Sequence, residues 1–204
     1  MVLPAVSSKE KIILILVFLF CLFIQVIPVI RSGLLYNYGI GFWGPNGHDG
    51  IWHLSLINHI SNPLKINLPI FAGETLKNYH PFFDILIAAL SKITTISSSV
   101  WLFQLFPLIS ASLFLYFSFK LGQKLSGKFS GGIILMLLNS INNSFGWIVT
   151  FIRSKSFSGE SLFWAMQSPS NQLNPPFIFS ILLLLILIYL LSNQNPKKIF
   201  IFLL

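Results

Sequence analysis

Long apolar runs constrain this chain more than any other feature of its sequence. Residues 12–30, 100–119, 133–152 and 176–192 contain no Asp, Glu, Lys or Arg. Their lengths are close to the roughly 20 residues with which an α-helix crosses a bilayer. The sequence therefore predicts an all-α, polytopic helical membrane protein with a single transmembrane domain. A fifth run, 199–204, is too short to span, so we expect the 204 residues to be the N-terminal piece of a longer protein.

The composition favours lipid as the partner of this chain. Only 9% of its residues are charged and 54% are hydrophobic, whereas about a quarter of the residues in soluble proteins are charged. A formal charge of +8 would suggest nucleic acid in a soluble domain. Here the Lys and Arg residues lie in small groups between apolar runs, so we expect a lipid bilayer and no nucleic acid. Cys21 is the one cysteine, which excludes an internal disulfide framework.

The positions of the lysines predict the topology. The segment 82–96 is short and carries Asp84 and Lys92, so its sequence alone does not decide whether it spans the membrane. Whether it spans decides the side of the membrane on which the later lysines lie. If it does not span, the lysine groups near residues 9–11, 120–128 and 197–198 all fall in the cytoplasm, as the positive-inside rule requires. We therefore predict a juxtamembrane or re-entrant helix over 82–96, with Asp84 and Lys92 within reach of water. The N-terminus is then cytoplasmic, in a multi-pass protein of the plasma membrane, with outer loops at 31–99 and 153–176.

Asp49 is the strongest candidate for chemistry in this topology. It follows the first predicted span, opens a predicted helix over 49–61, and shares one face with His53 at about 100° per residue. One interpretation is an N-cap, because Asp before a helix accepts a backbone N–H bond. The other is a carboxylate that takes a proton from an acceptor hydroxyl or binds a metal. His53, one turn later, is either a support for Asp49 through a hydrogen bond or a shared cation, or a packing residue.

Other candidate residues come from both predicted outer loops. Tyr79 and His80 belong to an aromatic part of the first loop and are candidates for substrate binding, although an interfacial aromatic belt explains such rings equally well. Arg153 and Lys155 are either ordinary flanking charges or cations for an anionic phosphate. The histidines lack zinc-ligand spacing, so we predict no zinc site. No cofactor is required by the sequence, and a divalent cation stays open.

The layout of the first half of the chain resembles the GT-C type integral membrane glycosyltransferases, including the protein mannosyltransferase and aminoarabinose transferase branches. The resemblance rests on one long span followed by GHDGIWHLSLI, NYHPFFDILIAALSKI and WLFQLFPLISASLFLYFSFKLGQKLSG. It implies a catalytic aspartate in the first outer loop, which by motif position is Asp49. It also implies a polyprenyl-phosphate-linked sugar donor and leaves the acceptor unknown. The family often has two acidic residues at this point and a double proline later, where this chain has His48–Asp49–Gly50 and His80–Pro81.

A non-enzymatic membrane protein, such as part of a transporter or flippase, is the alternative. Secondary transporters place ionisable groups or broken helices near the bilayer midplane. In this chain the apolar runs lack charges and most acidic residues fall in the predicted outer loops, which favours chemistry at the surface. Gln25, Gln104 and the asparagines of the third run keep the alternative open.

Overall fold

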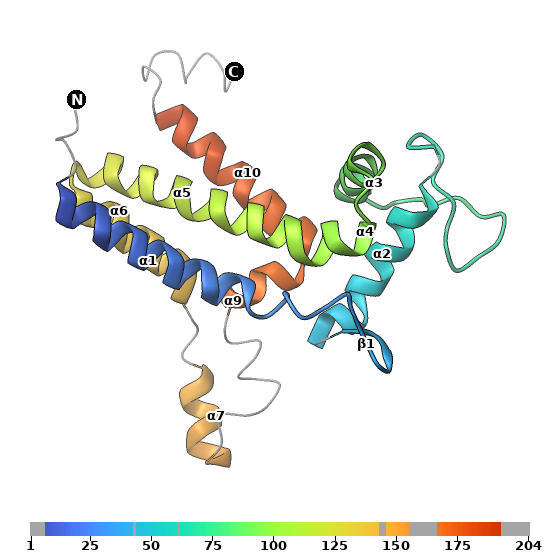
Figure 1. Ribbon diagram of the computed structural model, residues 1–204, viewed down its shortest axis with the longest axis horizontal. Coiled ribbons are helices and arrows are strands. Elements are labelled where there is room, and N and C mark those ends of the chain that lie inside the picture. The colour runs from blue at the N-terminus through green and yellow to red at the C-terminus, as the bar shows by residue number, and fades with distance from the viewer. Residues whose placement is uncertain (1–6, 43, 61, 143–145, 156–166, 193–204) are drawn as a thin grey trace.

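In a computed structural model of the chain, the described residues are 7–42, 44–60, 62–142, 146–155 and 167–192. The long helices pack side by side in a bundle, with α5 (Phe106–Ser126) in contact with each of the others. Those others are α1 (Ser8–Val26), α6 (Phe129–Ile141) and α10 (Pro175–Ser192). The structure is mostly helical, as the sequence predicts, and Figure 1 shows that the short elements gather at one end of the bundle.

The first helix begins with a complete capping box. Ser7 accepts a hydrogen bond from the Glu10 backbone N–H through its hydroxyl, and the Glu10 carboxylate accepts one from the Ser7 backbone N–H at 2.8 Å. Beyond α1 the chain turns at Gly33 into a small antiparallel hairpin of β1 (Leu34–Tyr36) and β2 (Gly39–Gly41). Gly33 has φ +73°, and a Cβ there would meet the Phe103 ring, so this turn needs glycine.

The helix predicted over 100–119 is present and extends further in both directions. The helical stretch covers Ser98–Ser126 and consists of α4 (Ser98–Val100), a π-helical turn η2 (Trp101–Leu105) and α5. In the π turn the Phe106 backbone N–H bonds the Trp101 carbonyl. Pro107 follows at once and has no N–H to donate, so the regular hydrogen-bond ladder is interrupted at this place.

Glycines set the close packing between α5 and α6. Gly127, at φ +68°, ends α5 in the left-handed conformation that favours glycine, and α6 returns along α5. A Cβ at Gly132 would lie 2.6 Å from the Phe119 ring, and one at Gly122 would lie 2.7 Å from the Leu135 Cβ. Small residues at such contacts let two helix backbones approach closely.

The continuous helix expected over 133–152 is broken in the structure. Helix α6 ends at Ile141, Asn142 is extended with φ −63° and ψ 131°, and α7 (Gly146–Ser154) projects from the bundle in Figure 1. Asparagine is a poor helix former because its side chain bonds nearby backbone groups, which is consistent with an end at this position. The run predicted over 176–192 is helix α10, while the run 199–204 lies outside the described residues.

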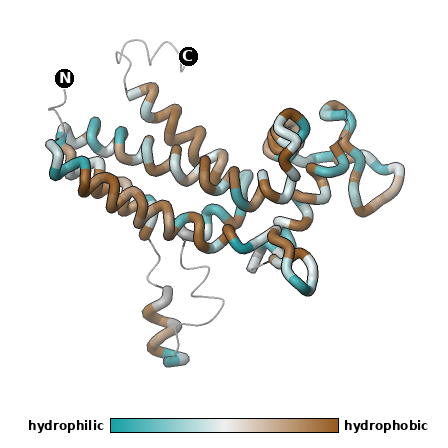
Figure 2. The backbone as a smooth tube through the Cα atoms, in the orientation of Figure 1, coloured by the Kyte–Doolittle hydropathy of each residue, from teal (hydrophilic) through white to brown (hydrophobic). Residues whose placement is uncertain are grey.

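The outside of the bundle is strongly apolar. Figure 2 shows hydrophobic residues along α1 and α10, and on α1 these include exposed Ile12, Leu16, Phe20 and Phe23. Within the described part of the chain, two helical stretches are long and apolar enough to cross a bilayer, Ser98–Ser126 and Pro175–Ser192. Helix α1 begins with Lys9, Glu10 and Lys11, which dilute the apolar character of its first turn.

Short elements make up the end of the bundle opposite the N-terminus of α1. They are η1 (Gly44–Gly47), α2 (Asp49–His59) and α3 (Phe82–Thr94), with α9 (Gln167–Ser170) and η3 (Asn171–Leu173) near the start of α10. The predicted helices over 49–61 and 82–96 are thus present, each two residues shorter.

At 1.5 Å per residue, α3 is about 20 Å long, well short of the roughly 30 Å of bilayer hydrocarbon. Figure 1 looks nearly along α3 while α1 and α5 run across the page, so α3 lies across the bundle direction.

Candidate functional site

Helices α2 and α3, with the segment between them, form what we call the α2–α3 cluster (residues 49–94). It is attached to the bundle by aromatic rings. The ring of Phe83 packs edge-on against Phe106 of α5 with centroids 4.8 Å apart, and Phe179 of α10 lies 6.1 Å from Phe83 and 5.9 Å from Phe106. Edge-to-face pairs at these distances are favourable beyond the area they bury. Two bundle helices from distant parts of the sequence, α5 and α10, therefore hold the cluster at the bundle end.

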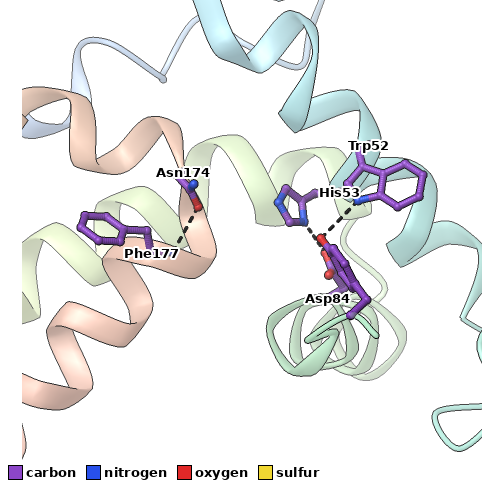
Figure 3. A network of polar contacts seen from close by, with 6 residues as sticks. Trp52, His53, Asp84, Asn174 and Phe177 are labelled. Carbon is purple, nitrogen blue, oxygen red and sulfur yellow. Dashed lines mark hydrogen bonds and ion pairs between the residues drawn. The ribbon is translucent and has the colours of Figure 1, made fainter. Parts of the chain in front are cut away.

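A buried ion pair joins α2 to α3. His53 Nδ1 lies 2.8 Å from Asp84 Oδ1, and the two residues are 7% and 0% exposed. The second carboxylate oxygen of Asp84 is also buried, with no hydrogen-bond partner in the described part of the chain. Figure 3 shows the two side chains pointing toward one another from α2 and α3. This contact fixes the orientation of the His53 ring and leaves Nε2 as the nitrogen available for another partner.

The predicted partner of His53 is therefore wrong. Asp49 and His53 are one turn apart, but the contact that His53 makes is with Asp84, 31 residues along the chain. The expectation that Asp84 lies within reach of water is wrong too, because its side chain is completely buried. Lys92 does remain exposed, and it donates a hydrogen bond to the Ile60 carbonyl at 3.0 Å.

Asp49 lies at the surface, at the first position of α2. Its side chain is 53% exposed, and Oδ1 is 2.8 Å from Nδ1 of His48, which is itself 94% exposed. The N-cap of α2 is His48, and no side chain bonds the free backbone N–H groups there, so the N-cap interpretation of Asp49 is wrong. A carboxylate in the first helical turn is still favoured by the positive end of the helix dipole.

The first turn of α2 explains why Asp49 is exposed although it shares an angular face with His53. The Cα–Cβ bonds of a helix point toward its N-terminus, so a side chain in the first turn extends beyond the packed surface. The adjacent Gly50 is buried instead, and a Cβ there would lie 2.9 Å from Cε1 of Phe103. Close packing at Gly50 holds this end of α2 against the bundle and directs Asp49 outward.

Tyr79, in the segment between α2 and α3, contacts Trp52 of α2. Its hydroxyl accepts a hydrogen bond from Trp52 Nε1 at 3.2 Å, and the two rings meet edge to face. Burial raises the pKa of Tyr79; the Trp52 hydrogen bond lowers it, and the negative charges of Asp84 and Asp49 raise it further. His80 is exposed and stacks on Tyr79 with centroids 4.9 Å apart, so both substrate-binding candidates lie in this cluster.

The structure does not bring Arg153 and Lys155 to the same place. Arg153 is in the last turn of α7 and Lys155 directly follows that helix, and both side chains are exposed. In Figure 1, α7 projects from the bundle away from α2 and α3. A phosphate beside Asp49 would not face these two cations in this arrangement.

The described residues contain no group of three or more His, Cys, Asp or Glu side chains that could hold a metal ion. The shared cation considered for Asp49 and His53 has no basis in their geometry, because the two side chains have different partners. The arrangement instead suits proton transfer. It offers an exposed carboxylate at the start of α2 and a buried histidine whose ring orientation is set by an aspartate.

Sequence reasoning missed Asp84 as part of the site. A signal was present, since Phe83, Asp84, Ile87 and Ala88 follow the i, i+3, i+4 spacing of a single helix face, and all four are buried. Because burying a carboxylate without a partner is costly, an aspartate on an apolar helix face indicates a polar partner on a neighbouring element.

Comparison of the chain with protein-family models, with curated proteins and with solved structures finds no match. The geometry of the α2–α3 cluster and the resemblance of its motifs are therefore the basis for a functional proposal.

Proposed function

We propose that this protein is an integral membrane glycosyltransferase that moves a sugar from a polyprenyl-phosphate-linked donor to an acceptor on the extracytoplasmic face. The observation that carries the proposal is the exposed carboxylate of Asp49 at the start of α2, the helix that the buried His53–Asp84 contact joins to α3. These residues belong to the two segments whose motifs resemble the GT-C enzymes.

The position of the cluster supports chemistry at a membrane surface. The exposed faces of α1 and α10 are apolar, as expected of helices in lipid, and the α2–α3 cluster lies at one end of them (Figure 2). Lys11 and Lys120 lie together at the other end, where they line one groove. In the multi-pass topology that we propose, the positive-inside rule places that basic end in the cytoplasm and the cluster outside.

Asp49 acts as the general base in this mechanism. Its carboxylate takes the proton of an acceptor hydroxyl while the hydroxyl oxygen bonds to the anomeric carbon of the donor sugar. The bond between that carbon and the phosphate oxygen breaks, and polyprenyl phosphate leaves. His53 is a positioning residue, because its contact with Asp84 holds α2 against α3 and so fixes the start of α2 where Asp49 lies.

Tyr79 and His80 provide an aromatic surface in the same cluster as Asp49. Their rings stack with only 17° between their planes, and His80 is exposed. A sugar ring can pack its apolar face against such a surface, which favours a role in binding. Arg153 and Lys155 are not part of this mechanism, because α7 lies away from the cluster.

The test is sugar transfer by the full-length protein reconstituted in vesicles with polyprenyl-phosphate donors labelled in the sugar. With water or an added membrane extract providing the acceptor hydroxyl, release of free polyprenyl phosphate gives a readout that does not depend on identifying the acceptor. Asp49→Asn should lower the rate by about 10²- to 10⁴-fold, because amides cannot act as general bases. The Asn variant should fold normally, since the Asp49 side chain is 53% exposed and its hydrogen bond is to the exposed His48.

Glu74→Gln is the matched control. Glu74 is another exposed carboxylate of the α2–α3 cluster, and it lies in the segment between the two helices. Its loss should leave the rate unchanged. Wild-type transfer by Asp49→Asn, or equal losses in both variants, would refute the role of Asp49.

A further inference from the structure

A groove runs between α1 and α5 at the basic end of the bundle, far along the helices from Asp49. It has a volume of about 490 Å³, within the range of about 300–1,000 Å³ in which proteins bind small molecules. Its walls are apolar and include Phe18, Leu19 and Tyr116, whereas Lys11, Lys120 and Gln123 provide polar groups.

The apolar part of the groove continues along α1. A second hollow of about 280 Å³ begins at Leu19, which both hollows share, and includes Val26, Ile30 and Leu108. From Lys11 to Leu19 the helix rises about 12 Å, which is close to the thickness of one leaflet of hydrocarbon, about 15 Å. An acyl chain that starts at the lysines would therefore have an apolar path as deep as its own leaflet.

The charges at the mouth of the groove are not balanced within the described part of the chain. Among the described residues the ion pairs are His48–Asp49 and His53–Asp84, and both lie at the opposite end of the bundle from the groove. Glu10, the nearest acid in sequence to Lys11, bonds Ser7 in the capping box. Lys11 of α1 and Lys120 of α5 are 109 positions apart in the sequence, yet they line the same hollow. An anion at this place would meet two cations.

Gln123 gives a second, independent indication of a polar ligand. Its side chain lines the groove and is only 4% exposed, and no hydrogen bond to it is found among the described residues. The amide is not among the fully enclosed unpartnered groups of the described residues, so it is accessible from the groove and can bond a polar ligand there. Phosphate and ester oxygens are acceptors for the amide N–H groups.

We propose that this groove binds an anionic glycerophospholipid from the leaflet at the basic end. One acyl chain lies along Phe18 and Leu19, and the phosphate faces Lys11, Lys120 and Gln123. Lysines that only obey the positive-inside rule would need to lie near helix ends, but would not need to converge on one apolar groove that also presents an amide. The site is at the opposite end from Asp49, so it does not depend on the proposed function.

Lipid binding to the purified, delipidated protein in detergent tests the proposal directly. Phosphatidylglycerol and phosphatidylcholine with identical acyl chains are titrated separately, and the bound lipid is counted by native mass spectrometry. The wild-type protein should retain phosphatidylglycerol preferentially. Because one lysine beside an anionic lipid contributes about fivefold in affinity, Lys11→Gln with Lys120→Gln should weaken this binding by about 25-fold.

Lys9→Gln with Lys128→Gln is the matched control. It removes the same charge from exposed lysines at the same end that do not line the groove. This pair should retain the lipid with less than a threefold change, and Lys11→Arg with Lys120→Arg should keep the preference. Circular dichroism shows whether each variant is folded.

A third variant addresses the apolar wall. Leu19→Trp places a large ring where the two hollows meet and should weaken phosphatidylglycerol and phosphatidylcholine alike. Equal weakening by the two lysine pairs would mean diffuse attraction and would overturn the site. A second outcome would also overturn the site. If a cysteine introduced at position 19 cross-links two copies of the chain and no lipid is bound, the groove is a protein interface.

Discussion

The α2–α3 cluster and the bundle are held together by different kinds of interaction. In the cluster, a buried His53–Asp84 pair and a Trp52–Tyr79 hydrogen bond join short segments distant in sequence. In the bundle, glycine contacts between α5 and α6 bring long apolar helices close together, and the polar contacts there involve neutral groups such as the Asn139 amide and the Ser118 hydroxyl. The cluster therefore depends on a few specific polar contacts, whereas the bundle depends on shape. Each kind of interaction should fail in its own way.

The largest loss of stability is expected from His53→Leu. This change leaves the completely buried Asp84 without its partner, and removing one member of a buried pair costs about 3–5 kcal/mol. The loss should be confined to the cluster, so hydrogen exchange should rise in 49–59 and 82–94 while α5 and α6 remain protected. Thermal unfolding and hydrogen exchange by mass spectrometry measure the two effects.

The double variant His53→Leu with Asp84→Leu sharpens this prediction. It removes both polar groups, so no buried charge remains, and its stability should exceed that of His53→Leu alone. A loss of stability in the double variant equal to the sum of the losses in His53→Leu and Asp84→Leu would mean that the pair does not couple α2 to α3.

A smaller loss is expected from Gly122→Ala, and it should appear in the bundle instead. The added Cβ would meet the Gly131 carbonyl and lie 2.7 Å from the Leu135 Cβ, and a backbone group cannot move aside without shifting a helix. Overpacking of this kind costs about 1–3 kcal/mol. Hydrogen exchange should rise in α5 and α6 and stay unchanged in the cluster. Ser130→Ala, at an exposed position of α6, is the control and should change stability by less than about 0.5 kcal/mol.

The smallest effect concerns Tyr79 and alkaline pH. Its pKa is raised in the folded protein, chiefly by burial, so the folded state favours the neutral phenol. The stability from this group is fully present below the unfolded pKa of about 10 and is lost as the pH rises through the folded pKa. Tyr79→Phe should therefore flatten the fall in stability above about pH 10. An identical pH profile in both proteins would show that Tyr79 is not desolvated by the cluster.

The helices were predictable from the sequence where one local pattern decides them. The apolar runs located α1, α5 and α10, the helical spacing after Asp49 located α2, and the short apolar segment 82–96 located α3. The break at Asn142 was not predicted, because a run that is apolar on average conceals a local preference against helix. The length of an apolar run therefore shows where a helix is expected, but not that it continues.

The site was predictable only in part because its contacts are not local. Asp49 and Tyr79 were identified from their motifs, yet the partner of His53 was sought one turn away instead of on another helix. Spacing along one helix cannot identify a contact between two helices. The burial of Asp84 depends on how α3 packs on α2 and the bundle, which the sequence of α3 alone does not determine.

The central claim is that the α2–α3 cluster and the basic end of the bundle lie on opposite sides of a membrane. Single cysteines at positions 77 and 124 test it most directly, after replacement of the buried Cys21 by serine. In intact cells, a membrane-impermeant thiol reagent should label position 77, in the segment between α2 and α3, and should leave position 124, near the end of α5, unlabelled until the membrane is opened. Labelling of position 124 from outside, or of both positions from the same side, would contradict this arrangement and would remove the extracytoplasmic location proposed for Asp49.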